Sequence, residues 1–457
     1  MSVSEALYPG SPTSKPRLSI SLTVRRSRLL IVVLALMYRV VIDLSYAFVV
    51  EPLFHYAGYE LRPNLEYLYT SYILVAVMAL LLPSREDHPS TDITFVFYVI
   101  TYIPFTSLFA LQPGDPEYFI LLNLAFLILF ATVKFVPTFR ALPNISYRLQ
   151  VLFALTLLCT AYVFATVVIR GGLSLVTFDI TRVYSVRWDI NNKILVGLSS
   201  YLVEWCSKIF IPALLVYGIW TKRRVVTLGS LALIIVFFGI TSAKGVLAYP
   251  ILVLIAYYGK KWDKFRTGFL WAAIAVPVLA FITYLSFGDV LVTGFLLNRI
   301  YFVPTLANFQ YYDFFQTHPM VYWSNTFMSA FYAYPYNDPI PIIMGRATFE
   351  GGTDSFTNVG IFATGYMQFG VIGMLIFPLL AGLSLKVIDS LAVNRMPAYV
   401  ALALSVVAGI QYLSGDLTET LLSHGVFMAW VTIYLMGDPE SRGSPKTRPP
   451  HEATGLA

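Results

Sequence analysis

Cysteine, histidine and charged side chains are all scarce in this chain. Of its 457 residues, 2 are cysteine, 5 are histidine and 12% are charged, whereas 57% are hydrophobic. Two cysteines cannot build a disulfide framework, and no group of cysteines and histidines has the spacing of a metal site. A soluble domain is roughly a quarter charged, so the composition excludes an ordinary water-soluble enzyme. The mean hydropathy of +0.70 indicates that most of the surface faces lipid.

Several sequence signatures of catalysis are absent as well. The chain contains no HExxH zinc motif, no GxSxG nucleophile elbow and no Walker A phosphate loop, and no predicted outer loop carries a DxD motif. These absences argue against a diphosphate held by a metal ion and against a pump driven by nucleotide hydrolysis.

Apolar segments that approach the length of a membrane span run through the chain. A bilayer core needs roughly 20 apolar residues per helix, and about twelve segments meet or approach that length. They lie near 29–50, 65–83, 93–111, 117–136, 149–169, 194–220, 229–243, 245–259, 268–286, 358–385, 397–414 and 420–436. We therefore predict an all-α polytopic membrane protein. Residues 29–436 form its single membrane domain, and residues 1–28 and 437–457 are expected to be disordered tails.

Lysine and arginine predict the orientation, because these residues are retained on the cytoplasmic side. If the N-terminus lies inside, the inner segments carry 21 of them and the outer segments carry 8. This bias predicts that both termini are cytoplasmic and that a large loop at about 287–357 lies outside. The net charge of +6 is therefore a topology signal and not evidence for nucleic-acid binding.

The outer loop at about 287–357 is the one long polar interruption between apolar segments, and long loops are usually functional. Residues 301–336 contain 14 aromatic residues. These suit helices lying at the membrane interface, where Tyr and Trp are favoured, and they also suit a stacking surface for sugar rings. The polar segment 345–360 follows, with Glu350 and Asp354. A glycine-rich stretch before a helix can present amides and carboxylates to a ligand.

Two ion pairs are predicted inside membrane helices, Arg39 with Asp43 and Glu204 with Lys208. Each pair has i,i+4 spacing, which places both partners on one helix face. Ionisable residues within spans are costly and often functional. Either pair can hold the bundle together, or it can line a polar cavity or a proton path. Glu204 and Lys208 follow an arginine-bearing outer loop, which favours a functional role for that pair.

Cationic side chains at the outer face are candidates for binding an anion. Lys244 lies at a predicted turn beside Ser242, where free backbone amides can join it; the alternative is a lysine that only reaches the interface. Loop 170–193 carries Arg182 and Arg187, and arginine forks bind phosphate bidentately. The alternative for this loop is an amphipathic helix whose arginines meet lipid headgroups.

Four short segments, taken in order, resemble the Wzy-type oligosaccharide repeat-unit polymerases. They are Thr241-Ser242-Ala243-Lys244-Gly245, FLLNRIYFVPTLANF at 295–309, the run from Asp354-Ser355 through Gly360 to residues 369–373, and the stretch from Glu419 to His424. Arg299 matches a family arginine, whereas Lys244 and His424 stand where relatives have arginine. Lysine keeps the charge but loses the bidentate fork. In layout the resemblance covers residues 29–436, and O-antigen ligases share that layout.

The resemblance implies a GT-C-like membrane glycosyltransferase that uses no metal and no other cofactor, with one large periplasmic loop that contains short helices. Its activity would be the polymerisation of oligosaccharide repeat units linked to undecaprenyl diphosphate, at the periplasmic face of the bacterial inner membrane. The implied partners are these lipid-linked oligosaccharides, membrane lipids and a chain-length regulator protein, with no nucleic acid. The alternatives are an O-antigen ligase acting on lipid A core, a lipid-linked oligosaccharide transporter and an envelope scaffold protein.

The expected roles of individual residues follow from this chemistry. Diphosphate is a good leaving group, so the transition state mainly needs fixed positive charge. The attacking sugar hydroxyl needs a base, which contributes roughly 10²–10⁴ in rate. The predicted catalytic residues are Arg299, Asp354 and Glu350, with Asp354 the preferred base. The predicted diphosphate contacts are Lys244, Arg182, Arg187 and His424, where His424 is alternatively a base. The predicted supporting polar residues are Glu204, Lys208, Ser355 and Asn358.

Overall fold

The structure is a computed structural model, and it describes residues 17–139, 143, 145–178, 189–348 and 356–437. All regular secondary structure in these ranges is helical, which confirms the prediction of an all-α protein. The first helix already begins at Arg17, within the segment that was expected to be a tail. The outermost parts of both predicted tails lie outside the described residues.

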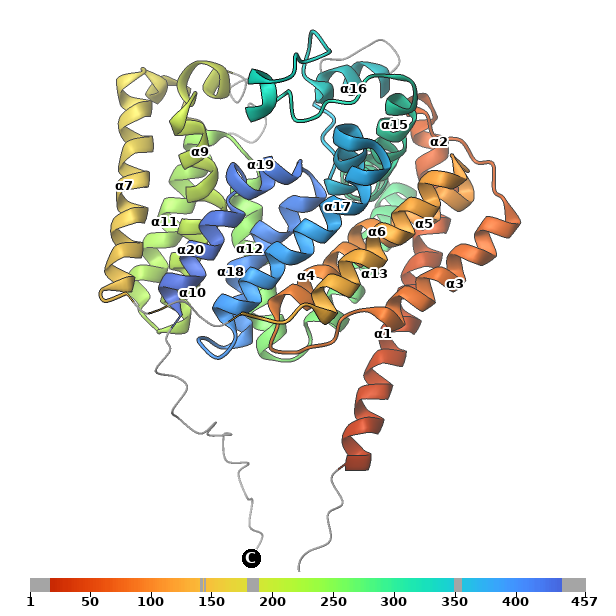
Figure 1. Cartoon of the computed structure of the whole chain (residues 1–457), viewed down its shortest axis with the longest axis horizontal. Coiled ribbons are helices and arrows are strands. Elements are labelled where there is room, and N and C mark those ends of the chain that lie inside the picture. The colour runs from red at the N-terminus through yellow and green to blue at the C-terminus, as the bar shows by residue number, and fades with distance from the viewer. Residues whose placement is uncertain (1–16, 140–142, 144, 179–188, 349–355, 438–457) are drawn as a thin grey trace, which may run out of the picture.

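The helices follow one another with short connections over most of the chain (Figure 1). The α-helices are α1 (Arg17–Ser45), α2 (Glu51–Phe54), α3 (Leu65–Leu81), α4 (Pro89–Phe97), α5 (Ile103–Leu111), α6 (Pro116–Phe135), α7 (Arg148–Ile169), α9 (Leu198–Trp205), α10 (Ile211–Trp220), α11 (Arg224–Thr241), α12 (Gly245–Lys261), α13 (Phe265–Phe287), α14 (Val290–Thr293), α15 (Val303–Thr317), α16 (Ile340–Thr348), α17 (Ile361–Ala392), α18 (Ala398–Ile410), α19 (Leu417–Leu422) and α20 (Val426–Met436). π-Helical segments join several of them: η1 (Tyr46–Val50), η3 (Tyr98–Tyr102), η5 (Ile190–Ile194), η6 (Cys206–Phe210) and η7 (Gly294–Phe302).

The bundle has two distinct ends. Helix α1 begins and α20 ends at one of them, which we call the terminal side, and α16 lies at the other, which we call the loop side (Figure 1). The distribution of lysine and arginine predicts that the terminal side faces the cytoplasm. That orientation stays a prediction from the sequence.

Nine helical segments in the described part of the chain are long and apolar enough to cross a bilayer. They are Arg28–Ala57, Pro89–Leu111, Pro116–Phe135, Arg148–Ile169, Leu198–Trp220, Arg224–Thr241, Phe265–Phe287, Val290–Thr317 and Ile361–Ala392. Leu65–Leu81 and Ala398–Leu413 are apolar but shorter. The protein thus has the character of a polytopic membrane protein, and the count of about twelve spans stays a prediction.

Val290–Thr317 differs from the loop with short helices that the sequence predicted. It is one continuous helical stretch of 28 residues, built from α14, η7 and α15. Tyr59 Oη, in the turn before α3, donates to Asn298 Oδ1 (2.7 Å), and Gln316 Nε2 donates to Asp115 Oδ2 (2.6 Å) in the turn before α6. Both turns lie on the loop side, so this stretch runs along the loop side rather than through to the terminal side.

Helix α17 is broken near its start. Phe369 and Gly370 have non-helical dihedrals, with φ of 60° at Gly370, in the left-handed region that favours glycine. A Cβ placed on Gly365 would lie 2.6 Å from the carbonyl oxygen of Gly373. Residues eight apart cannot touch in a straight helix, which rises 1.5 Å per residue. The first part of α17 therefore folds back on the rest as a tight hairpin, and its glycines permit the close approach.

The predicted Arg39–Asp43 ion pair is present and mostly buried. Arg39 is fully buried, and its Nη2 also donates to Ser71 Oγ (2.9 Å) and to a backbone carbonyl of α5 (3.1 Å). Asp43 accepts a hydrogen bond from Tyr72 Oη (2.7 Å). The pair links α1 to α3 and α5, which fits its interpretation as a structural element of the bundle.

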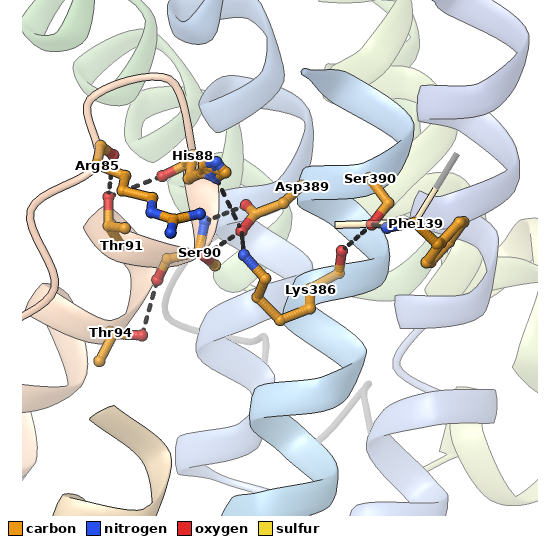
Figure 2. A network of polar contacts seen from close by, with 9 residues as sticks. All are labelled: Arg85, His88, Ser90, Thr91, Thr94, Phe139, Lys386, Asp389 and Ser390. Atoms are coloured by element: carbon orange, nitrogen blue, oxygen red, sulfur yellow. Dashed lines mark hydrogen bonds and ion pairs between the residues drawn. The ribbon is translucent and has the colours of Figure 1, made fainter. Parts of the chain in front are cut away.

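A second buried network, on the terminal side, joins α4 to α17 (Figure 2). Asp389 is fully buried and accepts hydrogen bonds from Ser90 N (3.0 Å), Ser90 Oγ (2.6 Å) and Lys386 Nζ (2.9 Å). His88 Nδ1 lies 3.4 Å from the same carboxylate. Because the amides in the first turn of a helix lack partners within it, Asp389 caps α4 from a neighbouring helix. The network fixes α4, which supplies one wall of the cavity described below.

Candidate functional site

Lys208 is a buried cation in the middle of a helix. The π-helical segment η6 carries it between α9 and α10, and short π-helical insertions are frequent at functional sites. Its Nζ lies 2.5 Å from the carboxylate of Glu204, which confirms the predicted pair. It also donates to Gln411 Oε1 (2.9 Å), at the end of α18. Lys208 is 6% exposed, so both contacts lie away from water and are stronger than they would be at the surface.

The turn between α18 and α20, Ser414–Gly425, brings further ionisable side chains to the same place. Its short helix α19 lies in the half of the bundle that faces the loop side (Figure 1). Trp205 Nε1 of α9 donates to Leu422 O (2.8 Å), which fixes the turn against the helix that bears Glu204. Within the turn, His424 N donates to Glu419 O (2.9 Å), and His424 Nε2 lies 3.5 Å from Glu419 Oε1.

His424 is a neutral imidazole at neutral pH. Burial, together with the nearby Lys208 ammonium, lowers the pKa of His424 to about 4. The turn lies outside the apolar helices, and His424 nevertheless stays mostly covered, with a 16% exposed side chain. A neutral ring can accept a proton or form a hydrogen bond, but it cannot pair with a phosphate as a cation. Glu204, Lys208, Gln411, Glu419 and His424 are called the Lys208 cluster below.

Lys244 lies close to this cluster. It precedes α12 in the turn after α11, where Ser242 has φ of 50°. Lys208 Nζ lies 6.0 Å from the ring centroid of Tyr249, which is on the first turns of α12. The outer loop that begins at 170 is held nearby, because Thr177 N donates to Gly239 O (3.1 Å) at the end of α11.

An apolar cavity of about 350 Å³ lies beside the Lys208 cluster. Its walls come from α4, α5, α6, α12, α13, α15, α17 and α18. Leu252 lines it one turn beyond Tyr249 on α12, and Ile410 and Leu413 line it on either side of Gln411. The same two elements, α12 and the end of α18, thus carry both the cavity wall and contacts of Lys208. The cavity is within the usual range of ligand pockets, about 300–1,000 Å³.

The predicted aromatic surface divides into two groups. Six aromatic residues of residues 301–315 are buried in the core: Tyr301, Phe302, Phe309, Tyr311, Tyr312 and Phe315. Exposed aromatics are found further along the loop, at Tyr322, Phe327, Phe331 and Tyr332. Only the second group can stack with a ligand that approaches from the loop side.

The structure brings some of the predicted site residues together and leaves others apart. Glu204, Lys208 and His424 share one cluster, and Lys244 lies in the neighbouring turn. Arg299 is exposed on η7, and its neighbour Asn298 is held by Tyr59, on the α1–α3 side of the bundle. It makes no direct contact with the Lys208 cluster.

Six further predicted residues lie in or beside gaps in the described chain. Asn358 is exposed just before α17. Glu350, Asp354, Ser355, Arg182 and Arg187 lie outside the described residues, so their predicted roles stay predictions. Within the ranges that the structure describes, no three or more His, Cys, Asp or Glu side chains converge in a group that could hold a metal ion.

Two members of the cluster were missed from the sequence. Glu419 belongs to a segment that was singled out only for His424, and Gln411 appeared as one polar residue at the end of an apolar run. The available signal for a functional role was that both are polar residues near the ends of predicted apolar segments. The partner of Gln411 is Lys208, 203 positions away, which could not be named without the fold. The partner of Glu419 is His424, in the same short segment.

No protein-family model matches this chain, and neither a curated protein nor a solved structure matches it. The resemblance to the Wzy-type polymerases therefore stays an expectation drawn from the sequence segments alone.

Proposed function

We propose that this protein is a membrane glycosyltransferase that polymerises oligosaccharide repeat units carried on undecaprenyl diphosphate. One observation carries the proposal: a cluster of buried and half-buried ionisable groups lies beside an apolar cavity. A ligand that fits both must have a long apolar part and an anionic head. A lipid-linked oligosaccharide has this form, since its diphosphate joins an isoprenoid chain to sugars.

The cavity suits the apolar part of such a substrate. Of its polar lining groups, Thr305 and Asn308 already donate to backbone carbonyls of their own helix. Apart from Thr101, Ser414 and Gly360, the remaining wall is aliphatic or aromatic. Burial of an isoprenoid chain there would be favoured by roughly 25 cal/mol for each Å² of apolar surface removed from water.

The cations suit the diphosphate. Lys208 is already desolvated, so its attraction for a developing negative charge is not weakened by bulk water. Fixed charges of this kind stabilise a transition state without reorganisation. Lys244 is an exposed second cation in the neighbouring turn. Arg299, Arg182 and Arg187 are proposed to complete the positive field from the loop side.

The base that activates the acceptor hydroxyl is proposed to be a carboxylate on the loop side. Asp354 and Glu350 are the candidates from the sequence, and Glu419 joins them from the Lys208 cluster. The side chain of Glu419 is 51% exposed, so a substrate can reach it. The neutral His424 beside it can hold the carboxylate in place or accept the proton itself.

The test compares the loss of the buried Lys208 with the loss of a lysine from an exposed ion pair of the same spacing. Lys208→Met removes the buried charge, whereas Lys193→Met removes the lysine of an exposed i,i+4 pair with Asp189 (2.7 Å). We expect Lys208→Met to lower the polymerisation rate by roughly 10²-fold, the loss seen when one transition-state donor is removed. Lys193→Met should keep the wild-type rate.

A further variant separates a catalytic role of Lys208 from a structural one. Glu204→Gln/Lys208→Met removes both charges of the pair, so no unpaired buried charge remains. It should recover the thermal stability lost in Lys208→Met but not the activity. If the double variant polymerises at the wild-type rate, the cation has no part in catalysis.

A further inference from the structure

Gln368 occupies a point where three separate parts of the chain meet. It is the last residue before the break in α17 and is fully buried. Its Oε1 accepts a hydrogen bond from Trp323 N (2.6 Å), in the segment that follows α15. Its Nε2 donates to Asp416 Oδ2 (3.1 Å), in the turn that bears Glu419 and His424. A second, longer contact joins Nε2 to Asn325 Oδ1 (3.4 Å).

The break in α17 makes this arrangement possible. An interrupted helix leaves backbone carbonyls without partners. Val321 N donates to Met367 O (3.0 Å) and Tyr322 N donates to Gln368 O (3.2 Å), so the loop segment satisfies both. Trp323 also packs against rings on both sides of the break, at 4.9 Å from Phe369 and 5.7 Å from Phe377 between ring centroids. The segment 321–325 is thereby fixed to the hairpin.

Asp416 connects Gln368 to the turn Ser414–Gly425. Its Oδ1 accepts from Thr418 N (2.9 Å) and Thr418 Oγ1 (2.8 Å), which caps the start of α19. Its Oδ2 remains for Gln368. One carboxylate therefore both starts the helix that carries Glu419 and ties that helix to α17. Asp416 is 7% exposed, so water cannot readily replace the amide of Gln368.

We propose that Gln368 is a positioning residue that holds the turn Ser414–Gly425, with Glu419 and His424, against the loop segment 321–325. Loss of its amide removes this donor from the buried Asp416 Oδ2, and the turn moves outward to hydrate the carboxylate. A packing role alone would not require an amide, because an apolar side chain of similar volume would fill the same space.

The experiment measures how accessible the turn is, independently of enzymatic activity. Thr420→Cys places a thiol at a fully buried position of α19, in a background with Cys159→Ala and Cys206→Ala. Gln368→Leu should raise the rate of maleimide labelling of this thiol by about tenfold or more in detergent, since a hydrogen bond to a charged group is lost.

The control is Gln112→Leu. Gln112 also bridges three groups, Tyr46 Oη (2.8 Å), Glu60 N (3.2 Å) and Gly58 O (2.8 Å), but at the end of α5.

A second variant tests the role of the amide through the pH dependence of labelling. Gln368→Glu keeps the shape and places two carboxyl groups within hydrogen-bond distance of one another. With one shared proton they bond, and with both ionised they repel. In the parent protein, which keeps Gln368, the same thiol also reacts faster as the pH increases, because the thiolate is the nucleophile. Relative to that parent, labelling of Gln368→Glu should therefore be similar at acid pH and faster as the pH increases, and Glu419 contributes to this repulsion through its proximity to Asp416. This variant also serves if Gln368→Leu does not fold.

Two results would overturn the inference. One is wild-type labelling in folded Gln368→Leu, and the other is an equal increase in Gln368→Leu and Gln112→Leu. A positioning role further predicts that the polymerisation rate of Gln368→Glu falls over the same pH range in which its labelling rises above that of the parent. That last readout alone rests on the proposed function. If the wild type polymerises nothing while labelling behaves as described, the proposed function fails and the inference stands.

Discussion

The network around Asp389 offers a quantitative test of the fold (Figure 2). Asp389→Asn preserves the shape of the side chain, and its amide oxygen can still accept from Ser90 N. Lys386, however, is 3% exposed and loses its counter-ion. Removing one partner of a buried pair typically costs about 3–5 kcal/mol. We expect the lower end, about 3 kcal/mol, because the capping hydrogen bond is retained.

A double variant isolates the charge from the other contacts of Asp389. Asp389→Asn/Lys386→Met leaves no unpaired charge, and it should regain about 2 kcal/mol relative to Asp389→Asn. The control is Asp338→Asn, which breaks the exposed pair of Asp338 with Arg346 (2.6 Å). Exposed pairs contribute about 0–1 kcal/mol.

Unfolding in mixed micelles of a mild detergent and SDS, followed by the fluorescence of the 7 tryptophans, measures these differences. A loss in Asp389→Asn no larger than in Asp338→Asn would refute the buried network. So would a double variant that is less stable than Asp389→Asn, because the two charges would then not be coupled.

Three further predictions concern the site. Arg299→Ala should abolish polymerisation while leaving membrane insertion intact. Arg299→Lys should retain part of the activity only if the positive charge matters more than the bidentate geometry of the guanidinium. Long chains made by a folded Arg299→Ala protein would remove Arg299 from the mechanism. The contribution of His424 to stability should fall as the pH drops from about 6.5 to about 4, because the unfolded chain takes up a proton at His424 there and the folded protein does not. The stability of wild type relative to His424→Gln in unfolding experiments should therefore decline over that window, and a difference that is constant with pH would contradict the lowered pKa of His424. Leu252→Trp should fill the cavity and slow the turnover of donors with a full-length isoprenoid chain more than that of short-chain analogues. Ile251→Trp, at a 59% exposed position on the same helix, should leave the turnover of both kinds of donor unchanged. Equal effects of the two variants would mean that the cavity does not hold the chain.

The sequence predicted those features of the fold that depend on neighbouring residues. Runs of apolar residues indicated most of the long helices, because a helix must match the thickness of the bilayer core. The pairs Arg39–Asp43 and Glu204–Lys208 were predictable because i,i+4 partners share a helix face in any helix. The clustering of Lys208 with His424 was not predicted, because the two residues lie in segments that are far apart in sequence.

Features that depend on distant residues were not predictable from one sequence. Asp389 was assigned no role, because its partner Ser90 is 299 positions away. The hairpin in α17 had a signal in Gly365, Gly370 and Gly373, but the segment 358–385 was predicted only as one apolar span. The stretch 290–317 looked like loop because its aromatic and polar residues lower its hydropathy. Its burial against α1 and α6 becomes evident only in the assembled bundle.

The most direct test of the proposed function supplies the purified protein in detergent with undecaprenyl-diphosphate-linked repeat units from the native host, without added nucleotide. The products are separated on a gel, with and without EDTA. The proposal predicts a ladder spaced by one repeat unit that EDTA does not change and that Lys208→Met weakens. Unchanged substrate, with folded protein and authentic repeat units, would contradict it. Transfer of the glycan only after lipid A core is added would identify a ligase instead.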